Sequence, residues 1–312
     1  MSAHPDPRPT PASTRAKTTV LTFQEKRRRG EPISMLTAYD HPTALIADEC
    51  GVDALLVGDS LAMVVLGHAN TLAVTMDEML HHARAVSRAA RSALLIGDLP
   101  FMSYQADATE AVRNAGRHVQ EGGMDAVKLE GGRAFADTAR AIVRAGIPVQ
   151  GHIGLTPQSV NALGGFRVQG RTAAAASALV DDALALEDAG CFSIVLESLP
   201  SRLAAHITER LSIPTIGIGA GAGTSGQVLV LHDLAGLYSR PSPKFAKRYA
   251  DLGASLRAAV TAYREEVEAR VFPAREHTYA MPDEEWNSFL AAQSARTEDA
   301  PRRPKPLARR AT

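Results

Sequence analysis

The stretch at residues 53–60 reads DALLVGDS, a short apolar run that ends in an acid. Four similar runs follow it: ALLIGDLP at 93–100, AVKLEG at 126–131, IPVQGHIG at 147–154 and FSIVLES at 192–198. The polar residues near the ends of these runs are Asp59, Asp98, Lys128, Glu130, His152 and Glu197. Buried parallel strands are apolar along their length, because an unpaired charge inside one costs several kcal/mol. Polar residues repeated at the carboxyl ends therefore indicate one shared site, at the end of a barrel that carries the chemistry.

The strand pattern repeats eight times along the chain, which predicts the fold. Strands are expected at 33–38, 54–58, 93–97, 126–129, 149–153, 192–196, 214–218 and 227–231. Apolar residues at helical spacing predict helices at 41–48, 76–91, 109–121, 134–144, 172–188 and 201–211. The link at 219–226 is too short for a helix, and 243–271 is expected to form one long helix or a pair. Together these elements predict an α/β fold, a (β/α)8 TIM barrel, with an open doubly wound sheet as the alternative.

The expected domain organisation is one catalytic barrel domain at 18–290 between two disordered tails. Residues 1–17 are rich in Pro, Ser, Thr and Arg, a composition that does not support a packed core. Residues 291–312 include the basic sequence RRPKPLARR and are read in the same way, as a solvated tail.

The composition excludes several classes of partner. Basic and acidic residues are equal in number, 34 of each, so no net field favours nucleic acid or an anionic membrane. No apolar stretch approaches the ~20 residues that span a bilayer, and the N-terminus has no signal-peptide core. The expectation is a cytoplasmic protein that binds neither nucleic acid nor membrane. Cys50 and Cys191 lack metal-site spacing and are expected to be buried thiols.

The acids at the ends of three neighbouring strands suggest a metal site. Asp59 and Asp98 each follow a glycine at a strand end, and Glu130 comes from the next strand. Three carboxylates form an oxygen-rich set that suits Mg²⁺. The alternative is that each acid caps the helix that follows its strand, a frequent role for Asp.

Each of the other polar residues at the strand ends has a functional and a structural interpretation. Lys128 alternates with apolar residues in VKLEGG, so it points to the same side of its strand as Glu130, where it pairs either with the site or with a surface acid. His152 is either a site residue or a hydrogen-bonded structural residue. Glu197 is a general base, or else a helix cap or a surface acid. The glycine-rich segment 217–223 matches a dinucleotide-binding pattern only weakly, because it opens no βαβ unit.

Several longer strings resemble the ketopantoate hydroxymethyltransferase family. They are GDSLAMVVLGHANTLAVTMDEMLHHARAV (58–86), DLPFMSY (98–104), VKLEGG (127–132), GHIGLTPQSVNALGGFRVQGR (151–171), IGIGAG (216–221) and PKFAK (243–247). The resemblance runs from about residue 18 to residue 279. This chain has Ala62 where the family usually has glycine and Ala73 where it usually has proline, which affects only local loop conformation. The resemblance implies a (β/α)8 barrel and a homo-oligomer, often a homodecamer.

The resemblance also implies the reaction. A hydroxymethyl group would pass from 5,10-methylenetetrahydrofolate, the co-substrate, to 3-methyl-2-oxobutanoate through a metal-stabilised enolate. The product would be 2-dehydropantoate, in the pantothenate pathway. A lyase or mutase of the phosphoenolpyruvate mutase type is an alternative, but it commonly carries a reactive loop cysteine. A barrel that lost its activity is the non-catalytic alternative, and loss of a metal acid would support it.

Roles for the site residues follow from the same motifs. Asp59 and Asp98 would bind one Mg²⁺ per subunit, or another divalent ion, with Glu130 completing the set directly or through water. The keto acid would be held by Ser60 and Lys128. Glu197 would be the proton acceptor. His152 is a further candidate for contact with the substrate.

Overall fold

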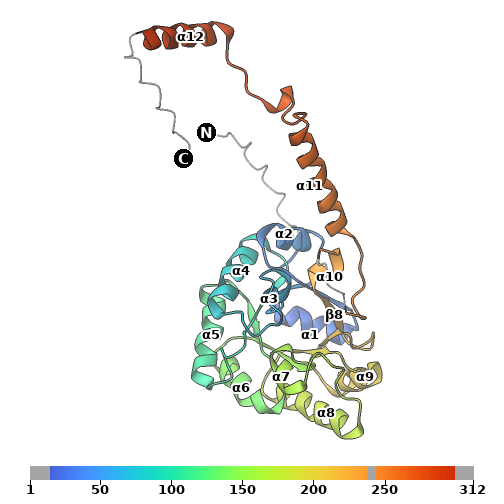
Figure 1. Cartoon of the computed structure of the whole chain (residues 1–312). Helices are drawn as coiled ribbons and strands as arrows, with labels where there is room; N and C mark the ends of the chain where they lie inside the picture. The colour runs from blue at the N-terminus through green and yellow to red at the C-terminus, as the bar shows by residue number, and fades with distance from the viewer. Residues whose placement is uncertain (1–14, 238–242, 299–312) are drawn as a thin grey trace, which may run out of the picture. The chain divides into compact units, whose positions relative to one another are not determined.

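The computed structural model describes residues 15–237 and 243–298, and its centre is a closed barrel of eight parallel strands (Figure 1). The strands are β1 (Ile33–Thr37), β2 (Ala54–Val57), β3 (Leu94–Asp98), β4 (Ala126–Lys128), β5 (Val149–Gly154), β6 (Ser193–Glu197), β7 (Thr215–Ile218) and β8 (Gly226–Leu229). They pair in sequence order, and β8 closes the barrel on β1. The predicted TIM barrel is confirmed, with strand ends that differ from expectation by one or two residues. The alternative prediction of an open doubly wound sheet is wrong.

The register of the strands brings their carboxyl ends to the same end of the barrel. Lys128 on β4 lies beside Asp98 on β3, and Glu197 on β6 lies beside Gly154 on β5. Because the strands are parallel and closed into a ring, residues that follow each strand meet around one central opening.

The six expected helices are present around the barrel. They are α2 (His41–Glu49), α4 (Met76–Ala89), α5 (Ala108–Gln120), α6 (Ala136–Arg144), α8 (Ala173–Asp188) and α9 (Ser201–Arg210). Side chains cap several of their N-termini, as in the reciprocal capping box of Thr75 and Glu78 at α4. No helix separates β7 from β8, as the short link predicts.

Further elements were not expected from the sequence. A helix α1 (Val20–Arg29) precedes the barrel, and short turns of helix lie at the strand ends. These short elements are α3 (Leu61–Val64), α7 (Val160–Leu163), α10 (Leu231–Ala235), η1 (Arg133–Phe135) and η2 (Pro157–Ser159).

The core has two layers. Inside the barrel, Phe23 from α1 packs with Ile33, Met35 and Phe192 at the end of the barrel where the strands begin. Outside it, buried side chains fill the space between strands and helices. Cys191 is buried, as expected, but Cys50 is exposed, because it lies at the C-terminal end of α2 and not on its buried face.

The chain divides into two compact units, which differ from the single domain expected at 18–290. The first ends at Gly253, and the second begins at Ala254. The second contains most of α11 (Leu252–Glu268), the turn η3 (Arg275–His277) and α12 (Asp283–Glu298). Residues 291–298 are therefore helical, whereas the sequence predicts a disordered tail there. The rest of the two expected tails, 1–14 and 299–312, lies outside the described residues.

The last three residues of the expected N-terminal tail are held against the barrel. Arg15 donates to the carbonyl of Val52 at 3.0 Å, and Lys17 donates to the carbonyl of Ala93 at 2.7 Å. The ordered chain therefore begins before residue 18.

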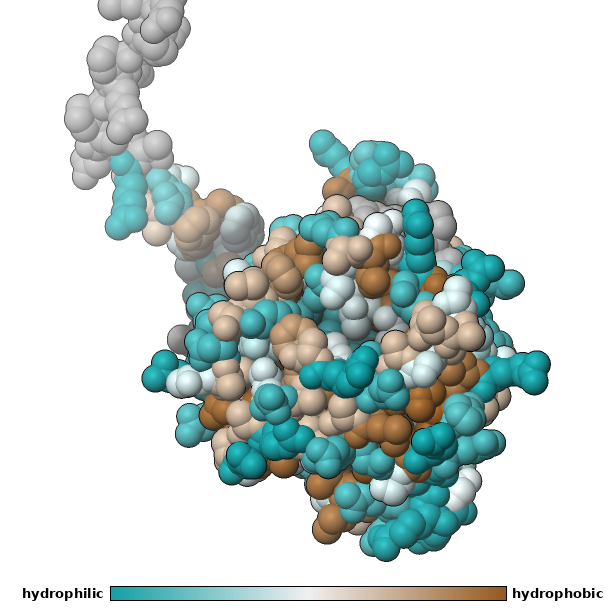
Figure 2. Space-filling view, turned by 90° about the horizontal axis from the view of Figure 1, so that it is seen from below, coloured by the Kyte–Doolittle hydropathy of each residue, from teal (hydrophilic) through white to brown (hydrophobic). Residues whose placement is uncertain are grey.

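The surface mixes polar and apolar side chains. On the face seen in Figure 2, hydrophobic side chains are interspersed with hydrophilic ones and form no continuous belt. Over the ranges 15–237 and 243–298, no helix is long and apolar enough to cross a membrane.

Candidate active site

A cavity of about 610 Å³ opens at the carboxyl ends of the strands. Its lining combines apolar side chains with a polar floor. All seven predicted site residues line it, namely Asp59, Ser60, Asp98, Lys128, Glu130, His152 and Glu197. The structure thus brings together residues that the sequence separates by up to 138 positions, from 59 to 197.

The centre of the floor is an ion pair between neighbouring strands. The ammonium nitrogen of Lys128 lies 2.8 Å from Oδ1 of Asp98 and 4.0 Å from Oε1 of Glu130. All three side chains are nearly inaccessible to solvent. Burial acts to lower the pKa of Lys128, but the charges of Asp98, Glu130 and Asp59 outweigh it and keep the pKa above its ordinary value. Lys128 is therefore a fixed cation that faces the site, and the reading as a surface lysine is wrong.

Asp59 follows β2 and reaches the same cluster. Its backbone N–H donates to Oδ2 of Asp98 at 3.2 Å, and its Oδ2 accepts from Nε2 of Gln158 at 3.0 Å. Burial raises the pKa of Asp59 well above its usual range, and the charges of Asp98 and Glu130 raise it further. The ionised form of Asp59 is therefore disfavoured, and a nearby positive charge would stabilise it.

The acids do not cap helices. The nearest helix after Asp59 is α3, whose N-cap is Ser60 and receives no side-chain bond. The helix after Asp98 is α5, which is capped by Asp107. Because α3 has no side-chain cap and α5 is capped by Asp107, the capping alternative does not explain Asp59 or Asp98.

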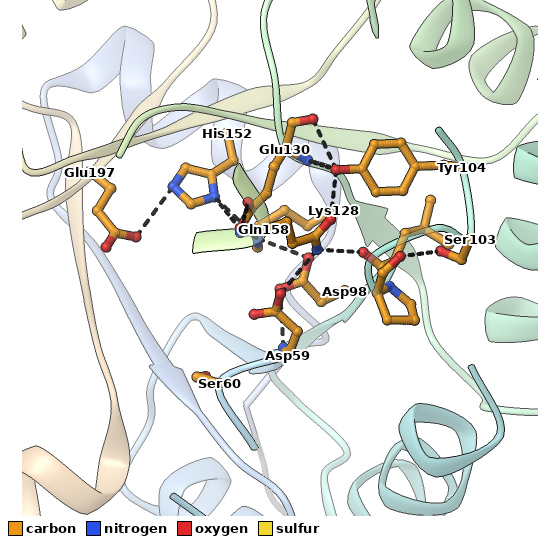
Figure 3. A network of polar contacts seen from close by, with 12 residues as sticks. Asp59, Ser60, Asp98, Ser103, Tyr104, Lys128, Glu130, His152, Gln158 and Glu197 are labelled. Carbon is orange, nitrogen blue, oxygen red and sulfur yellow. Dashed lines mark hydrogen bonds and ion pairs between the residues drawn. The ribbon is translucent and has the colours of Figure 1, made fainter. Parts of the chain in front are cut away.

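His152 connects two acids on opposite sides of its ring (Figure 3). Its Nδ1 lies 3.3 Å from Oε1 of Glu130, and its Nε2 lies 3.3 Å from Oε2 of Glu197. Burial and the nearby Lys128 lower the pKa of His152, but hydrogen bonds to Glu130 and Glu197 raise it to about 9. The ring lies between the two carboxylates, and its Nδ1 is also 3.3 Å from the ammonium nitrogen of Lys128.

Ser60 lies at the edge of the cluster, where its hydroxyl is 2.8 Å from the hydroxyl of Tyr39. The glycine before Asp98 has a structural reason. A Cβ on Gly97 would lie 2.4 Å from Nδ1 of His118, so glycine leaves room for this buried ring. His118 holds the end of β3 through Nε2, which is 2.9 Å from the carbonyl oxygen of Asp98.

Two residues that the sequence reasoning missed organise the acids. The amide of Gln158 binds Asp59 through Nε2, its backbone N–H donates to Oε2 of Glu130 at 2.9 Å, and its Oε1 accepts from the hydroxyl of Tyr104 at 2.9 Å. Tyr104 also donates to the carbonyl of Glu130 at 3.0 Å. Gln158 lies in the short turn η2 and Tyr104 in the loop after β3, inside the quoted motifs TPQS and DLPFMSY, so strand-end polarity could not reveal them.

The donor chemistry of the floor fits a hard divalent cation, although its geometry is not that of a finished metal cage. Three buried carboxylates, Asp59, Asp98 and Glu130, face a single lysine. In the described part of the chain, no group of three or more His, Cys, Asp or Glu side chains is arranged to hold a metal ion. Glu130 is already held by His152 and Gln158. Asp98 and Asp59 are also held, by Lys128 at 2.8 Å and by Gln158 at 3.0 Å, so all three acids already have polar contacts.

Comparison with known proteins points in one direction. The family model for ketopantoate hydroxymethyltransferase matches residues 17–275. A 3-methyl-2-oxobutanoate hydroxymethyltransferase of Oleidesulfovibrio alaskensis is 58% identical over 275 residues, which cover 88% of this chain and 95% of the relative. A protein of the same name from Syntrophobacter fumaroxidans is 60% identical over 264 residues, covering 85% of this chain and 92% of the relative.

Solved structures share the fold at much lower identity. A phosphonopyruvate hydrolase, crystallised with oxalate and Mg²⁺, has a TM-score of 0.53 and 15% identity, covering 90% of this chain and 97% of its own. A 2,3-dimethylmalate lyase of the PEP mutase/isocitrate lyase superfamily has a TM-score of 0.53 and 17% identity, with 89% and 99% coverage. At these identities the likeness supports the barrel architecture alone.

Proposed function

The chain belongs to the ketopantoate hydroxymethyltransferase family, and from this premise we propose what its site does. The protein transfers a hydroxymethyl group from 5,10-methylenetetrahydrofolate to 3-methyl-2-oxobutanoate, giving 2-dehydropantoate for pantothenate biosynthesis. The observation in the structure that carries this proposal is the buried Lys128–Asp98 pair beside Asp59 on the cavity floor. A small keto acid needs a cation for its carboxylate and a strongly polar environment for its enolate, and this floor supplies both.

Asp59 and Asp98 are the residues that would hold Mg²⁺ or another divalent ion, one per subunit, with Glu130 acting directly or through water. When bound, a divalent cation stabilises the negative charge that develops on an enolate oxygen. Lys128 pairs with the carboxylate of the keto acid, and Ser60 donates a hydrogen bond to it.

Glu197 is the proposed base that removes the proton from C3 of the keto acid. Its side chain is 16% exposed, more than Lys128, Glu130 or His152, so a substrate in the cavity can reach it. His152 faces Glu197 with Nε2, the ring nitrogen opposite the one that faces Glu130, and so holds the carboxylate of Glu197 in one orientation. A base that is oriented by a neighbour and open to substrate meets the geometric requirement for general base catalysis.

Assembly and location are part of the same proposal. The family resemblance supports a cytoplasmic homo-oligomer, often a homodecamer, whose ligands are the keto acid and the folate.

The mutase-type alternative lacks its diagnostic residue. Cys50 and Cys191 are the two cysteines of the chain, and neither lines the described cavity. The inactive-barrel alternative predicts that a metal acid has been lost, but Asp59, Asp98 and Glu130 are all present and buried.

The test is an assay for 2-dehydropantoate from methylenetetrahydrofolate and 3-methyl-2-oxobutanoate, with and without a chelator. The expected result is product formation that chelation abolishes and added Mg²⁺ restores. Activity that is insensitive to exhaustive chelation would contradict the metal proposal, and absence of product under all conditions would contradict the function.

A further inference from the structure

One acid in the cavity lies outside the network described above. Five acidic side chains line the described cavity: Asp59, Asp98, Glu130, Glu197 and Asp233. The first four are joined through Lys128, His152 and Gln158 (Figure 3). Within residues 15–237 and 243–298, the carboxylate of Asp233 makes no hydrogen bond and no ion pair within 4 Å. The reaction steps proposed above do not use it.

The position of Asp233 is fixed by its neighbours. It lies on α10, which directly follows β8, and the backbone N–H of Leu231 donates to Oγ1 of Thr37 at 2.9 Å. The ring of His232 packs against the ring of Tyr39 at 5.4 Å. Burial raises the pKa of Tyr39, and the charges of Asp59 and Asp233 both contribute. Asp233 thus adjoins His232, which packs on Tyr39, and it lines the same cavity as Asp59.

Away from the acids, most of the residues that line the cavity are apolar, with Arg167 and Lys244 as the basic exceptions. Val230 lies one turn before Asp233 on the chain, Phe245 comes from the segment after α10, and Met63 and Val64 come from α3. Such walls suit a flat, uncharged ring more than a small keto acid, whose carboxylate Asp233 would repel. An acceptor-only carboxylate at one edge of an apolar slot selects a heteroaromatic ring with adjacent N–H donors.

We infer that Asp233 binds the pyrimidine edge of the folate co-substrate by accepting hydrogen bonds from the 2-amino group and N3–H of the pterin. The inference rests on the proposed function. The 2-amino and N3–H donors lie side by side, so they match the two oxygens of one carboxylate. The one-carbon unit is on the opposite side of the pterin, at N5 and N10. A pterin held at Asp233 therefore presents that unit toward the floor, where the keto acid is bound.

Asp233→Asn tests the assignment, since the amide keeps the size of the side chain and replaces one acceptor oxygen with a donor. Calorimetry would measure the Kd of 5-formyltetrahydrofolate and of its 2-desamino-2-methyl analogue for both proteins. Wild type is expected to bind the parent roughly 10–100-fold more tightly than the analogue, the worth of a charge-assisted hydrogen bond. Asp233→Asn is expected to bind the two equally. The KM for methylenetetrahydrofolate should rise by a similar factor.

Two controls separate this inference from the proposed function. Proton exchange at C3 of the keto acid needs no folate, so Asp233→Asn should retain it. Asp251→Asn is the matched control. Asp251 lies 3.8 Å from the guanidinium of Arg248 and does not line the cavity, so this variant should retain the preference for the 2-amino group. An Asp233→Asn protein that still prefers the 2-amino compound, or that loses affinity for both compounds equally, would overturn the inference. A wild-type protein that makes no 2-dehydropantoate would overturn the proposed function instead.

Discussion

Glu197 is 16% exposed, more than Asp98 or Glu130, and among the described residues its carboxylate lies 3.3 Å from Nε2 of His152. Glu197→Gln keeps the shape of the side chain and removes its basicity. Turnover is expected to fall by roughly 10²–10⁴, the usual worth of general base catalysis. Exchange of the C3 proton of 3-methyl-2-oxobutanoate, followed by NMR in D₂O, should fall with it while the keto acid still binds. Unchanged exchange would transfer the base role to another residue, and His152 would be the next candidate.

Asp59 and Asp98 carry the metal proposal, and the structure separates the effects of their substitution. Asp59→Asn should stabilise the metal-free protein or leave it unchanged, because it removes one of several crowded, buried carboxylates. Asp98→Asn should destabilise it, because Lys128 loses its 2.8 Å partner. Both variants should bind Mg²⁺ and keto acid more weakly, since a neutral amide is a poorer ligand for a hard cation.

Calorimetric titration and metal-free thermal melts measure these two quantities separately. Excess Mg²⁺ should partly restore activity to either variant. Wild-type affinity for Mg²⁺ and keto acid in both variants would contradict the metal site.

At the residue level, the sequence pointed to side chains that converge on one cavity where a polar residue interrupts an apolar strand. Asp98 and Lys128 are conspicuous in the sequence because nothing polar is expected there. Gln158 and Tyr104 organise the same acids, but they lie in a short helical turn and a loop between longer elements, where polar residues are common and carry no signal. Their roles depend on which strand ends are adjacent in space, which only the closed barrel determines.

Among the elements, α1 is held in place by one buried acid, Asp53. Asp53, at the start of β2, accepts from Lys26 at 2.7 Å and from Arg15 at 2.9 Å, and it also accepts from the backbone N–H of Ser34 at 2.8 Å. Burial acts to raise the pKa of Asp53, but the hydrogen bonds from Lys26 and Ser34 outweigh it and lower the pKa below 3.8. The carboxylate is therefore more stable in the folded protein than in the unfolded chain.

This arrangement predicts how stability depends on pH. A carboxyl group with a lowered folded pKa contributes stability above its unfolded pKa of about 3.8, and the contribution is lost as the pH falls through the folded value. Asp53→Asn should lower the free energy of unfolding by roughly 1.5–3 kcal/mol at neutral pH, the worth of hydrogen bonds to a charged group. Urea titrations at pH 7 and at successively lower pH would show the difference between the two proteins shrinking below pH 4. A difference that stays constant down to pH 2 would contradict this role.

Long elements were predicted well because their periodicity extends over many residues. One long helix, α12, was missed, and its described side chains are all exposed, so burial gives it no periodic signal. The other helices missed are of two kinds. Short turns such as α3 and α10 have too few residues to show a period, and α1 carries four basic residues in its last turn, which hide its single buried side chain, Phe23. The amphipathic signal therefore failed where only one residue is buried.

On the scale of the whole molecule, the two ends of the barrel have different tasks. The end where the strands finish carries the cavity and its acids. The end where the strands begin is closed by α1 and the residues that pack on it. The sequence could predict this polarity, because polar tips occur at the strand ends, but not the division into two units. The boundary near residue 253 interrupts no obvious compositional pattern, since α11 continues across it.

The separation of tasks predicts that stability and catalysis can be changed independently. Phe23 is fully buried and packs edge-on against Phe192, with ring centroids 5.8 Å apart. Phe23→Ala should lower the free energy of unfolding by roughly 3–5 kcal/mol through lost burial and the cavity left behind. The Tm should fall by on the order of 10 °C. Below the new Tm, kcat and the KM for the keto acid should stay at wild-type values, because Phe23 does not line the active-site cavity.

Leu21→Ala is the matched control for this last prediction, because Leu21 is on the same helix but 63% exposed. It should leave both Tm and kinetics close to those of wild type. Differential scanning calorimetry and steady-state kinetics on the three proteins make the comparison. A large loss of kcat in Phe23→Ala at a temperature where it is fully folded would show that the two ends of the barrel are coupled and would contradict their independence.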